Sequence, residues 1–106
     1  MPLLDLRQAR AEIRLRDVLD LLGWTAHTRR GVQVRGPCPV HGSRSPTSRS
    51  FSAHLGKQAW RCFRCGACGN ALDLWVQATR QELYAAVADL YRRLGRALPL
   101  RQPAPP

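Results

Sequence analysis

Two pairs of metal-binding residues limit what this chain can fold into. Two residues separate Cys38 from His41, two separate Cys62 from Cys65, and twenty residues lie between the pairs. Each pair can occupy a tight turn that directs both side chains at one point. Three thiolates and one imidazole are a ligand set that structural zinc prefers. We therefore predict one closed, structural Zn²⁺ site formed by Cys38, His41, Cys62 and Cys65, with no open position for a catalytic water.

The fourth cysteine, Cys68, leaves two alternatives open. It lies three residues after Cys65, so it could replace Cys65 or His41 as a ligand. The interpretation that we favour is a small buried residue or a free thiol. A redox role for Cys62 and Cys65 would require a thioredoxin-like βαβ context, which the sequence lacks.

The length of 106 residues predicts one small domain, expected to be a monomer. A structural zinc contributes about 10–16 kcal/mol of apparent binding free energy, as much as the net stability of a whole domain. We therefore expect the central segment to need the metal in order to fold.

The sequence has no run of eighteen apolar residues and no signal-peptide pattern, so we expect no membrane span. We expect a cytoplasmic location, where thiols stay reduced.

The charge is uneven along the chain. The net charge is +10, and all seven acidic residues lie outside residues 21–72. A basic segment without acids is typical of proteins that bind polyanions such as nucleic acids. Arginine-rich codon usage would explain the preference for arginine over lysine, but not the absence of acids from this segment. The candidate phosphate contacts are Arg29, Arg30, Arg35, Arg44, Arg49, Lys57, Arg61 and Arg64, and the candidate stacking side chains are Trp60 and Phe63, with a core position for Trp60 left equally open.

Residues at helical spacing predict one helix before the zinc segment. Leu15, Val18, Leu19 and Leu22 would lie on one helix face, and Gly23 can end the helix in a left-handed conformation. Within the basic segment, alternating apolar residues predict short strands at 32–34, 51–55 and 58–61, with a turn at 29–31 and a polar surface loop at 42–50.

Two further helices are expected after the zinc segment. Asn70 is a good N-cap, with Asp73 three residues on. Residues 79–82 read Thr-Arg-Gln-Glu, a capping-box pattern that predicts the start of the second helix. Its expected buried positions share helical spacing: Leu83, Val87, Leu90 and Leu94.

These elements predict a small α+β zinc ribbon. It would contain a short antiparallel sheet with one zinc site, one N-terminal helix and two C-terminal helices. We expect the zinc-binding domain to cover residues 13–98, with its metal site within 38–65. Residues 1–12 are expected to be a lead-in, and the proline-rich residues 99–106 a disordered tail.

The zinc segment resembles a known family. Its Cys38-Pro-Val-His41 motif, Ser50-Phe51, and Cys62-Phe-Arg-Cys-Gly-Ala67, together with Val34-Arg-Gly-Pro37, are similar to the zinc-binding domain of bacterial DnaG-type DNA primases. The resemblance covers roughly residues 13–95. The resemblance implies a Cys-His-Cys-Cys zinc finger with the four ligands named above. It also implies that Phe63 corresponds to the aromatic residue that the family has beside the second motif.

In that family the zinc domain contacts single-stranded template and helps to choose where an RNA primer begins during DNA replication, while a separate domain polymerises. The resemblance therefore implies a stand-alone module that binds single-stranded DNA and supports primer synthesis in trans, with a separate primase polymerase or helicase as partner. The seven acids show no cluster that could support two-metal polymerisation, so we expect no enzyme activity. The alternatives are a zinc-ribbon regulator of duplex DNA, a protein-interaction adaptor, or a degenerate primase remnant.

Overall fold

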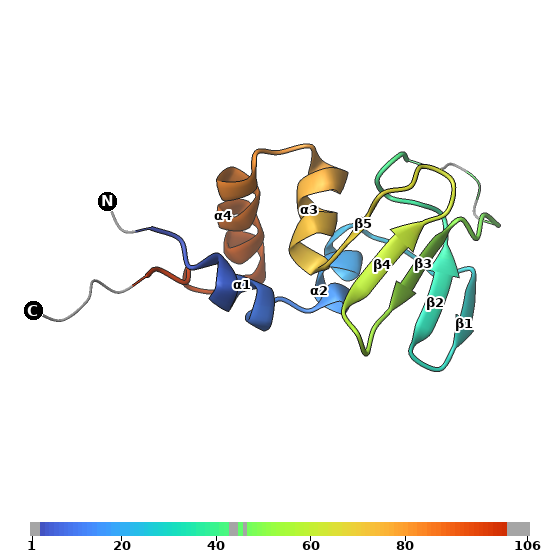
Figure 1. Ribbon diagram of the computed structural model, residues 1–106, viewed down its shortest axis with the longest axis horizontal. Coiled ribbons are helices and arrows are strands. Elements are labelled where there is room, and N and C mark those ends of the chain that lie inside the picture. Colours follow the sequence, from blue (N-terminus) through green and yellow to red (C-terminus); the bar gives the residue numbers. More distant parts are fainter. Residues whose placement is uncertain (1–2, 43–44, 46, 102–106) are drawn as a thin grey trace, which may run out of the picture.

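The computed structural model describes residues 3–42, 45 and 47–101. These residues form a five-stranded antiparallel sheet and four helices (Figure 1). Each strand pairs with the next one in the sequence. The strands are β1 (Thr28–Arg30), β2 (Gln33–Gly36), β3 (Phe51–His54), β4 (Ala59–Cys62) and β5 (Cys68–Gly69). The helices are α1 (Leu6–Glu12), α2 (Leu15–Leu21), α3 (Ala71–Thr79) and α4 (Leu83–Leu94).

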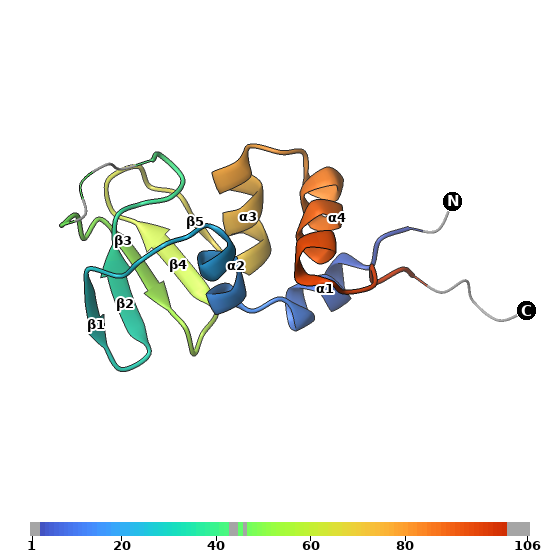
Figure 2. The ribbon, with the colours of Figure 1, turned by 180° about the vertical axis from the view of Figure 1, so that it is seen from behind.

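One face of the sheet is buried. Val34, Ala53 and Trp60 lie opposite one another on β2, β3 and β4, and all three side chains are buried. Phe51 extends this inner face and stacks on Trp60, with 5.6 Å between the ring centroids. Seen from behind, α2 and the segment that leads from it to β1 lie in front of this face (Figure 2). Because side chains alternate along a strand, the remaining positions point to the opposite, outer face.

The helix predicted before the zinc segment is present as α2. Its buried side chains are Leu15, Val18 and Leu19, at the predicted helical spacing. Gly23 has a φ of 67°, the left-handed conformation expected at the helix end. The amide of Trp24 donates to the carbonyl of Leu19 at 3.0 Å, the Schellman hydrogen bond that accompanies such a cap. This cap directs the chain across the inner face of the sheet.

The predicted cap of α3 is also present. The Asn70 side chain accepts from the amide of Asp73, and the Asp73 carboxylate accepts from the amide of Asn70, each at 2.9 Å. This reciprocal pair satisfies two backbone donors and fixes where the helix begins after β5.

Asn70→Ala is expected to lower the free energy of unfolding of the zinc-loaded protein by about 1 kcal/mol, because the first turn of α3 loses its side-chain acceptor. Thermal unfolding followed by circular dichroism measures the change. Asn70→Asp is the matched control, since aspartate retains an acceptor oxygen at the N-cap. Equal destabilisation by both variants would contradict this role.

Residues 6–12, which the sequence suggested were part of a lead-in, form helix α1. The Asp5 side chain caps it by accepting from the amide of Gln8 at 3.0 Å, and Ala9 is fully buried. At the end of the helix, Glu12 accepts a 2.6 Å hydrogen bond from the hydroxyl of Tyr91 on α4. A helix of seven residues is too short to show a clear apolar period, so contacts with distant residues stabilise it instead.

The start of α4 was predicted wrongly from the Thr79–Glu82 pattern. Thr79 is the last residue of α3, and its hydroxyl donates to the carbonyl of Trp75 at 2.5 Å. Arg80 then takes a left-handed conformation that ends α3. The N-cap of α4 is Glu82, whose carboxylate accepts from the amides of Tyr84 and Ala85. The conformation of the turn between α3 and α4, rather than the local capping pattern, therefore decides where α4 begins.

Two other boundaries differ from the sequence-based expectations. Residues 28–30 form β1 and the turn lies at residues 31–32, because the Arg30–Gln33 pair closes the hairpin two residues later than predicted. At the chain ends, Leu4 pairs with Leu100 in an antiparallel bridge, and the amide of Asp5 donates to the carbonyl of Pro99 at 2.7 Å. The predicted disordered tail therefore begins with ordered residues; residues 102–106 lie outside those described.

Within the part of the chain that the structure describes, none of the helices has the length and apolar character needed for a membrane span.

Candidate metal centre and nucleic-acid interface

The four predicted zinc ligands converge at one end of the sheet. Cys38 and His41 follow β2, Cys62 ends β4, and Cys65 lies in the turn that follows. One ligand atom from each residue lies within 4.8 Å of those of the others, and Cys62 Sγ is 3.6 Å from His41 Nδ1. Zinc–sulfur bonds of about 2.3 Å and zinc–nitrogen bonds of about 2.0 Å place tetrahedral ligand atoms about 3.5–3.8 Å apart. The donor set and its spacing therefore fit a Zn²⁺ ion.

Both ligand pairs occupy turns that end in a glycine. Gly42 follows His41 with a φ of 67°, and Gly66 follows Cys65 with a φ of 79°, conformations that are strained for other residues. In the second turn, the amide of Cys65 donates to Cys62 Sγ at 3.4 Å, and the amide of Gly66 donates to the carbonyl of Cys62 at 2.9 Å. These backbone bonds hold the two thiols of the pair on the same side of the turn.

Two buried thiols of the site have pKa values shifted in opposite directions. Burial raises the pKa of Cys38 to about 12. Burial also opposes the ionisation of Cys62. Hydrogen bonds from the amides of Cys65 and Arg64 and from the thiols of Cys65 and Cys38 outweigh this burial effect, and they lower the pKa of Cys62 to about 7. Cys62 therefore ionises first, and zinc binding must displace the proton held by Cys38.

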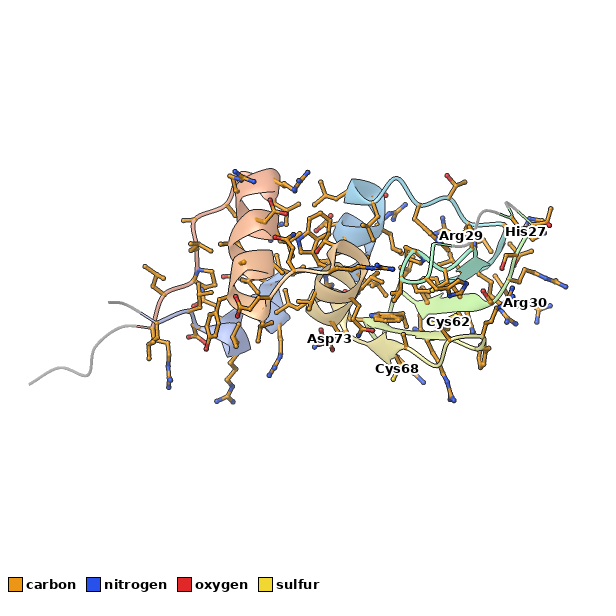
Figure 3. The ribbon with its side chains drawn as sticks, turned by 90° about the horizontal axis from the view of Figure 1, so that it is seen from above. His27, Arg29, Arg30, Cys62, Cys68 and Asp73 are labelled. Atoms are coloured by element: carbon orange, nitrogen blue, oxygen red, sulfur yellow. The ribbon has the colours of Figure 1, made fainter. Side chains whose placement is uncertain are left out.

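Cys68 does not belong to the ligand cluster found among the described residues. It lies on β5 opposite Arg61, and its side chain is exposed rather than buried. Figure 3 shows Cys68 on the side of the sheet away from α2. Of the two states expected for Cys68 as a non-ligand, the structure favours the free thiol.

We expect the zinc-loaded protein to contain one reactive thiol, that of Cys68, because the other three sulfurs are held as ligands. Titration with 5,5′-dithiobis(2-nitrobenzoate) under native conditions measures this number. Cys68→Ser should remove the reactive thiol and keep one zinc per chain by elemental analysis. A loss of zinc from this variant would show that Cys68 is a ligand.

The outer face of the sheet brings together three of the predicted nucleic-acid contacts. Arg35, Ser52 and Arg61 lie opposite one another on β2, β3 and β4. Phe63, just beyond β4, is 60% exposed, and the guanidinium carbons of Arg35 and Arg61 lie 5.2 and 5.5 Å from its ring centroid. Arg35 also donates to the carbonyl of Arg49 at 2.7 Å, which fixes its position. We call Arg35, Arg61 and Phe63 the arginine–phenylalanine cluster.

The other predicted phosphate contacts are more scattered. Arg30 lies on β1, Lys57 in the β3–β4 turn and Arg64 within the second zinc turn, all exposed. Arg29 lies opposite Val34, so its side chain is on the inner, α2 side of the sheet (Figure 3), whereas the arginine–phenylalanine cluster is on the outer face. Arg49 is exposed beside the cluster, and Arg44 lies outside the described residues.

Trp60 was proposed as a stacking side chain, and the structure corrects this. Its side chain is only 3% exposed, on the inner face of the sheet, and its Nε1 donates to the carbonyl of Asn70 at 2.7 Å. Its ring stacks on Phe51. Trp60 is therefore a core residue with no ring face free for a base, which is the alternative that the sequence left open.

Two polar residues of the outer face, Gln33 and Ser52, were not predicted from the sequence as neighbours of the cluster. Gln33 Nε2 donates to the hydroxyl of Ser52 at 3.1 Å, beside Arg35. The alternation of Phe51, Ser52 and Ala53 was the available signal, because it places Ser52 opposite the apolar face.

Comparisons with known proteins agree with this geometry. The sequence matches the CHC2 zinc finger family over residues 5–104. It is 37% identical over 86 residues to the DNA primase of Halalkalibacterium halodurans, an alignment that covers 80% of this chain and 14% of that primase. It is 43% identical over 83 residues to the DNA primase of Geobacillus stearothermophilus, covering 70% of this chain and 13% of that primase.

A solved structure shares the fold. It is that of the zinc-binding and RNA polymerase domains of the Aquifex aeolicus primase, with a TM-score of 0.70 and 29% identity. The match covers 89% of this chain and 22% of that chain, so the similarity concerns a small part of the larger protein. The family match and the ligand geometry together identify the site as a structural zinc site, as the sequence predicted.

Proposed function

Because this chain belongs to the CHC2 zinc finger family, we propose that it is a zinc-dependent module that binds single-stranded template DNA and supports RNA primer synthesis in trans. The relatives are DNA primases, and the chain spans about 14% of the length of the first of them. Under this proposal, primer synthesis itself belongs to a separate polymerase that works beside this module, and the module acts as a monomer in the cytoplasm.

The observation that carries the proposal is the arginine–phenylalanine cluster. An exposed phenyl ring with two guanidinium groups near it offers two kinds of contact to a single strand. Bases stack on aromatic rings and on guanidinium planes, while the positive charge attracts phosphates. Ser52 lies between the two arginines on β3 and is itself buried, so the exposed groups of the cluster are Phe63 and Arg61.

We further propose that the chain does not polymerise nucleotides. Two-metal chemistry needs carboxylates that converge on one point. Here Asp5, Asp73 and Glu82 cap helices. Asp89 pairs with Arg92 and Arg93, and Glu12 accepts from Tyr91. Those carboxylates are therefore engaged in holding the fold.

The helical half offers less support for the alternative of a duplex-DNA regulator. Such a regulator would need a basic recognition helix, and the best candidate cluster is at the end of α4. Hydrogen bonds from Gln81, Arg92 and Arg93 lower the pKa of Asp89 to about 2, so this carboxylate stays ionised and offsets the two arginines. Arg96 lies 3.9 Å from Asp17 on α2.

Fluorescence anisotropy with matched single- and double-stranded oligonucleotides tests the proposal, with zinc-loaded and chelated protein at several salt concentrations. We expect a preference for the single strand that persists at moderate salt and disappears with the metal. Equal, steeply salt-dependent binding of both forms, with or without zinc, would mean that the arginines act as a nonspecific polycation and would overturn the proposal.

A further inference from the structure

A second basic surface lies on the α2 side of the sheet, away from the arginine–phenylalanine cluster. Three arginines and two aliphatic residues line a hollow there, namely Arg14, Arg16, Arg29, Val32 and Leu55. The volume of this hollow is about 340 Å³, within the range of about 300–1,000 Å³ typical of ligand sites. We call these five residues the basic groove.

Three segments form the walls of the basic groove, and hydrogen bonds join them. They are the start of α2, the β1–β2 turn and the β3–β4 turn, which lie at one edge of the molecule (Figure 2). The amide of Leu55 donates to the carbonyl of Val32 at 2.8 Å, which joins the two turns. The amide of Leu15 donates to Gln58 Oε1 at 2.5 Å, which joins α2 to the β3–β4 turn. The groove is therefore preorganised, so a ligand would not have to order these segments.

The protein does not neutralise the positive charge of the groove. Its three arginines are exposed, and the ion pairs found among the described residues involve other arginines. Among the described residues that line the groove, the only carboxylate is that of Asp17, which lies 3.9 Å from a guanidinium nitrogen of Arg96. Three guanidinium groups therefore face the solvent here without a carboxylate of their own.

The groove also has an aliphatic part. Val32 is 50% exposed although it occupies a two-residue hairpin turn, where glycine and polar residues are the common choices. Leu55 beside it is partly buried. No aromatic side chain is present among the described residues that line the groove, so a nucleic-acid base would find no ring on which to stack. The combination of guanidinium groups with exposed aliphatic surface suits an acidic protein segment better than a nucleic acid.

The basic groove and the arginine–phenylalanine cluster are separate sites. The cluster is on the outer face near the zinc turns, where β2 and β4 end. The groove includes Arg29, whose side chain is on the inner side of the sheet, and the turns after which β2 and β4 begin. A strand bound at the cluster would therefore leave the groove free.

We propose that the basic groove binds an acidic polypeptide segment of a partner protein. A large apolar side chain of the segment packs on Val32 and Leu55, and its carboxylates pair with the three arginines. The inference rests on the proposed function, because a module that supports primer synthesis in trans must contact a separate polymerase or helicase. Carboxylates form strong bidentate hydrogen bonds with guanidinium groups, and the apolar contact buries surface that the fold leaves exposed. The partner and the template strand can thus be held at the same time.

A ¹H–¹⁵N NMR titration of the wild-type, zinc-loaded protein tests this site with three sets of short synthetic peptides. The first set combines aspartate and glutamate with one leucine or phenylalanine at each position in turn. The second set has serine in place of the apolar residue, and the third has glutamine in place of the acids. We expect the first set to shift the resonances of Arg16, Arg29, Val32 and Leu55, and the other two sets to bind more weakly. A single-stranded oligonucleotide should leave these resonances unchanged.

Two results would overturn the proposal. If no peptide shifts the groove resonances while single-stranded DNA still binds in a zinc-dependent way, the groove is not a partner site and the proposed function stands. If the oligonucleotide shifts these resonances and the peptides do not, the groove is a nucleic-acid site instead. Failure of the proposed function gives a different result, the loss of zinc-dependent single-strand binding with the peptide shifts retained.

A matched pair of variants gives an independent measure. Arg16→Glu and Arg10→Glu make the same change of charge at exposed arginines of neighbouring helices, but only Arg16 lines the groove. Arg16→Glu should weaken binding of the acidic, leucine-containing peptides about 2- to 30-fold at low salt, because repulsion replaces attraction. Arg10→Glu should weaken it much less, and both variants should bind single-stranded DNA equally. Equal peptide affinities for the two variants would contradict the proposal.

Val32→Thr tests the apolar contact without changing the charge. Threonine keeps the branched shape of valine and replaces one methyl group by a hydroxyl, so the turn should retain its conformation. This variant should weaken binding of the leucine-containing peptides and leave binding of the serine-containing peptides unchanged. An equal effect on both sets would contradict an apolar contact at this residue.

Discussion

Cys62→Ser is expected to abolish zinc binding and to unfold the sheet. Cys62 is fully buried, ends β4 and supplies one of the four ligands. Structural zinc contributes about 10–16 kcal/mol of apparent binding free energy, while a small domain has a net stability of about 5–15 kcal/mol. Loss of the metal therefore removes about as much free energy as the net stability of the whole fold. Elemental analysis and circular dichroism of the purified variant measure the two effects.

Cys68→Ser is the matched control, because it makes the same chemical change at an exposed cysteine outside the ligand cluster. It should bind one zinc and give the wild-type spectrum. Chelation of zinc from the wild-type protein should reproduce the Cys62→Ser spectrum. A chelated protein whose spectrum does not change would contradict the view that the metal holds the sheet together.

Phe63→Ala is expected to weaken single-strand binding about 5- to 150-fold, because base–aromatic stacking contributes about 1–3 kcal/mol per base. The phenyl ring is 60% exposed, so its removal should cost the fold little. Fluorescence anisotropy with single-stranded and duplex oligonucleotides measures the change, and the loss should be smaller for the duplex. Phe63→Trp should retain binding because it keeps an aromatic face.

Tyr84→Ala controls for the general loss of an exposed aromatic residue. Tyr84 is 48% exposed on α4, outside the sheet, and its loss should not affect binding.

Arg61→Gln tests the charged part of the arginine–phenylalanine cluster. Each lost phosphate contact should reduce the slope of log affinity against log salt by about 0.7. Equal effects of Phe63→Ala and Tyr84→Ala would contradict the assigned interface.

Local patterns predicted the features that depend on local chemistry. The zinc ligands could be identified because two short turns must each present two donors, and this spacing is read directly from the sequence. The caps at Gly23 and Asn70 were predictable for the same reason, since each depends on residues within one helical turn. The sheet and its α+β class followed from alternation near these turns.

Features that depend on distant residues were not predictable. Trp60 alternates with polar neighbours, and only pairing with β3 and contact with Phe51 decide which face it takes. Helix α1 depends on Tyr91, 79 residues from its hydrogen-bond partner Glu12.

We propose that zinc holds together a sheet whose outer face binds single-stranded DNA. The most direct measurement is a ¹H–¹⁵N NMR titration of the zinc-loaded protein with a single-stranded oligonucleotide. We predict that the largest shifts will occur at Arg35, Ser52, Arg61 and Phe63, with α4 unaffected, and that the dispersed sheet resonances will collapse on chelation. Shifts confined to the arginines of α4, or sheet resonances that survive chelation, would contradict this proposal.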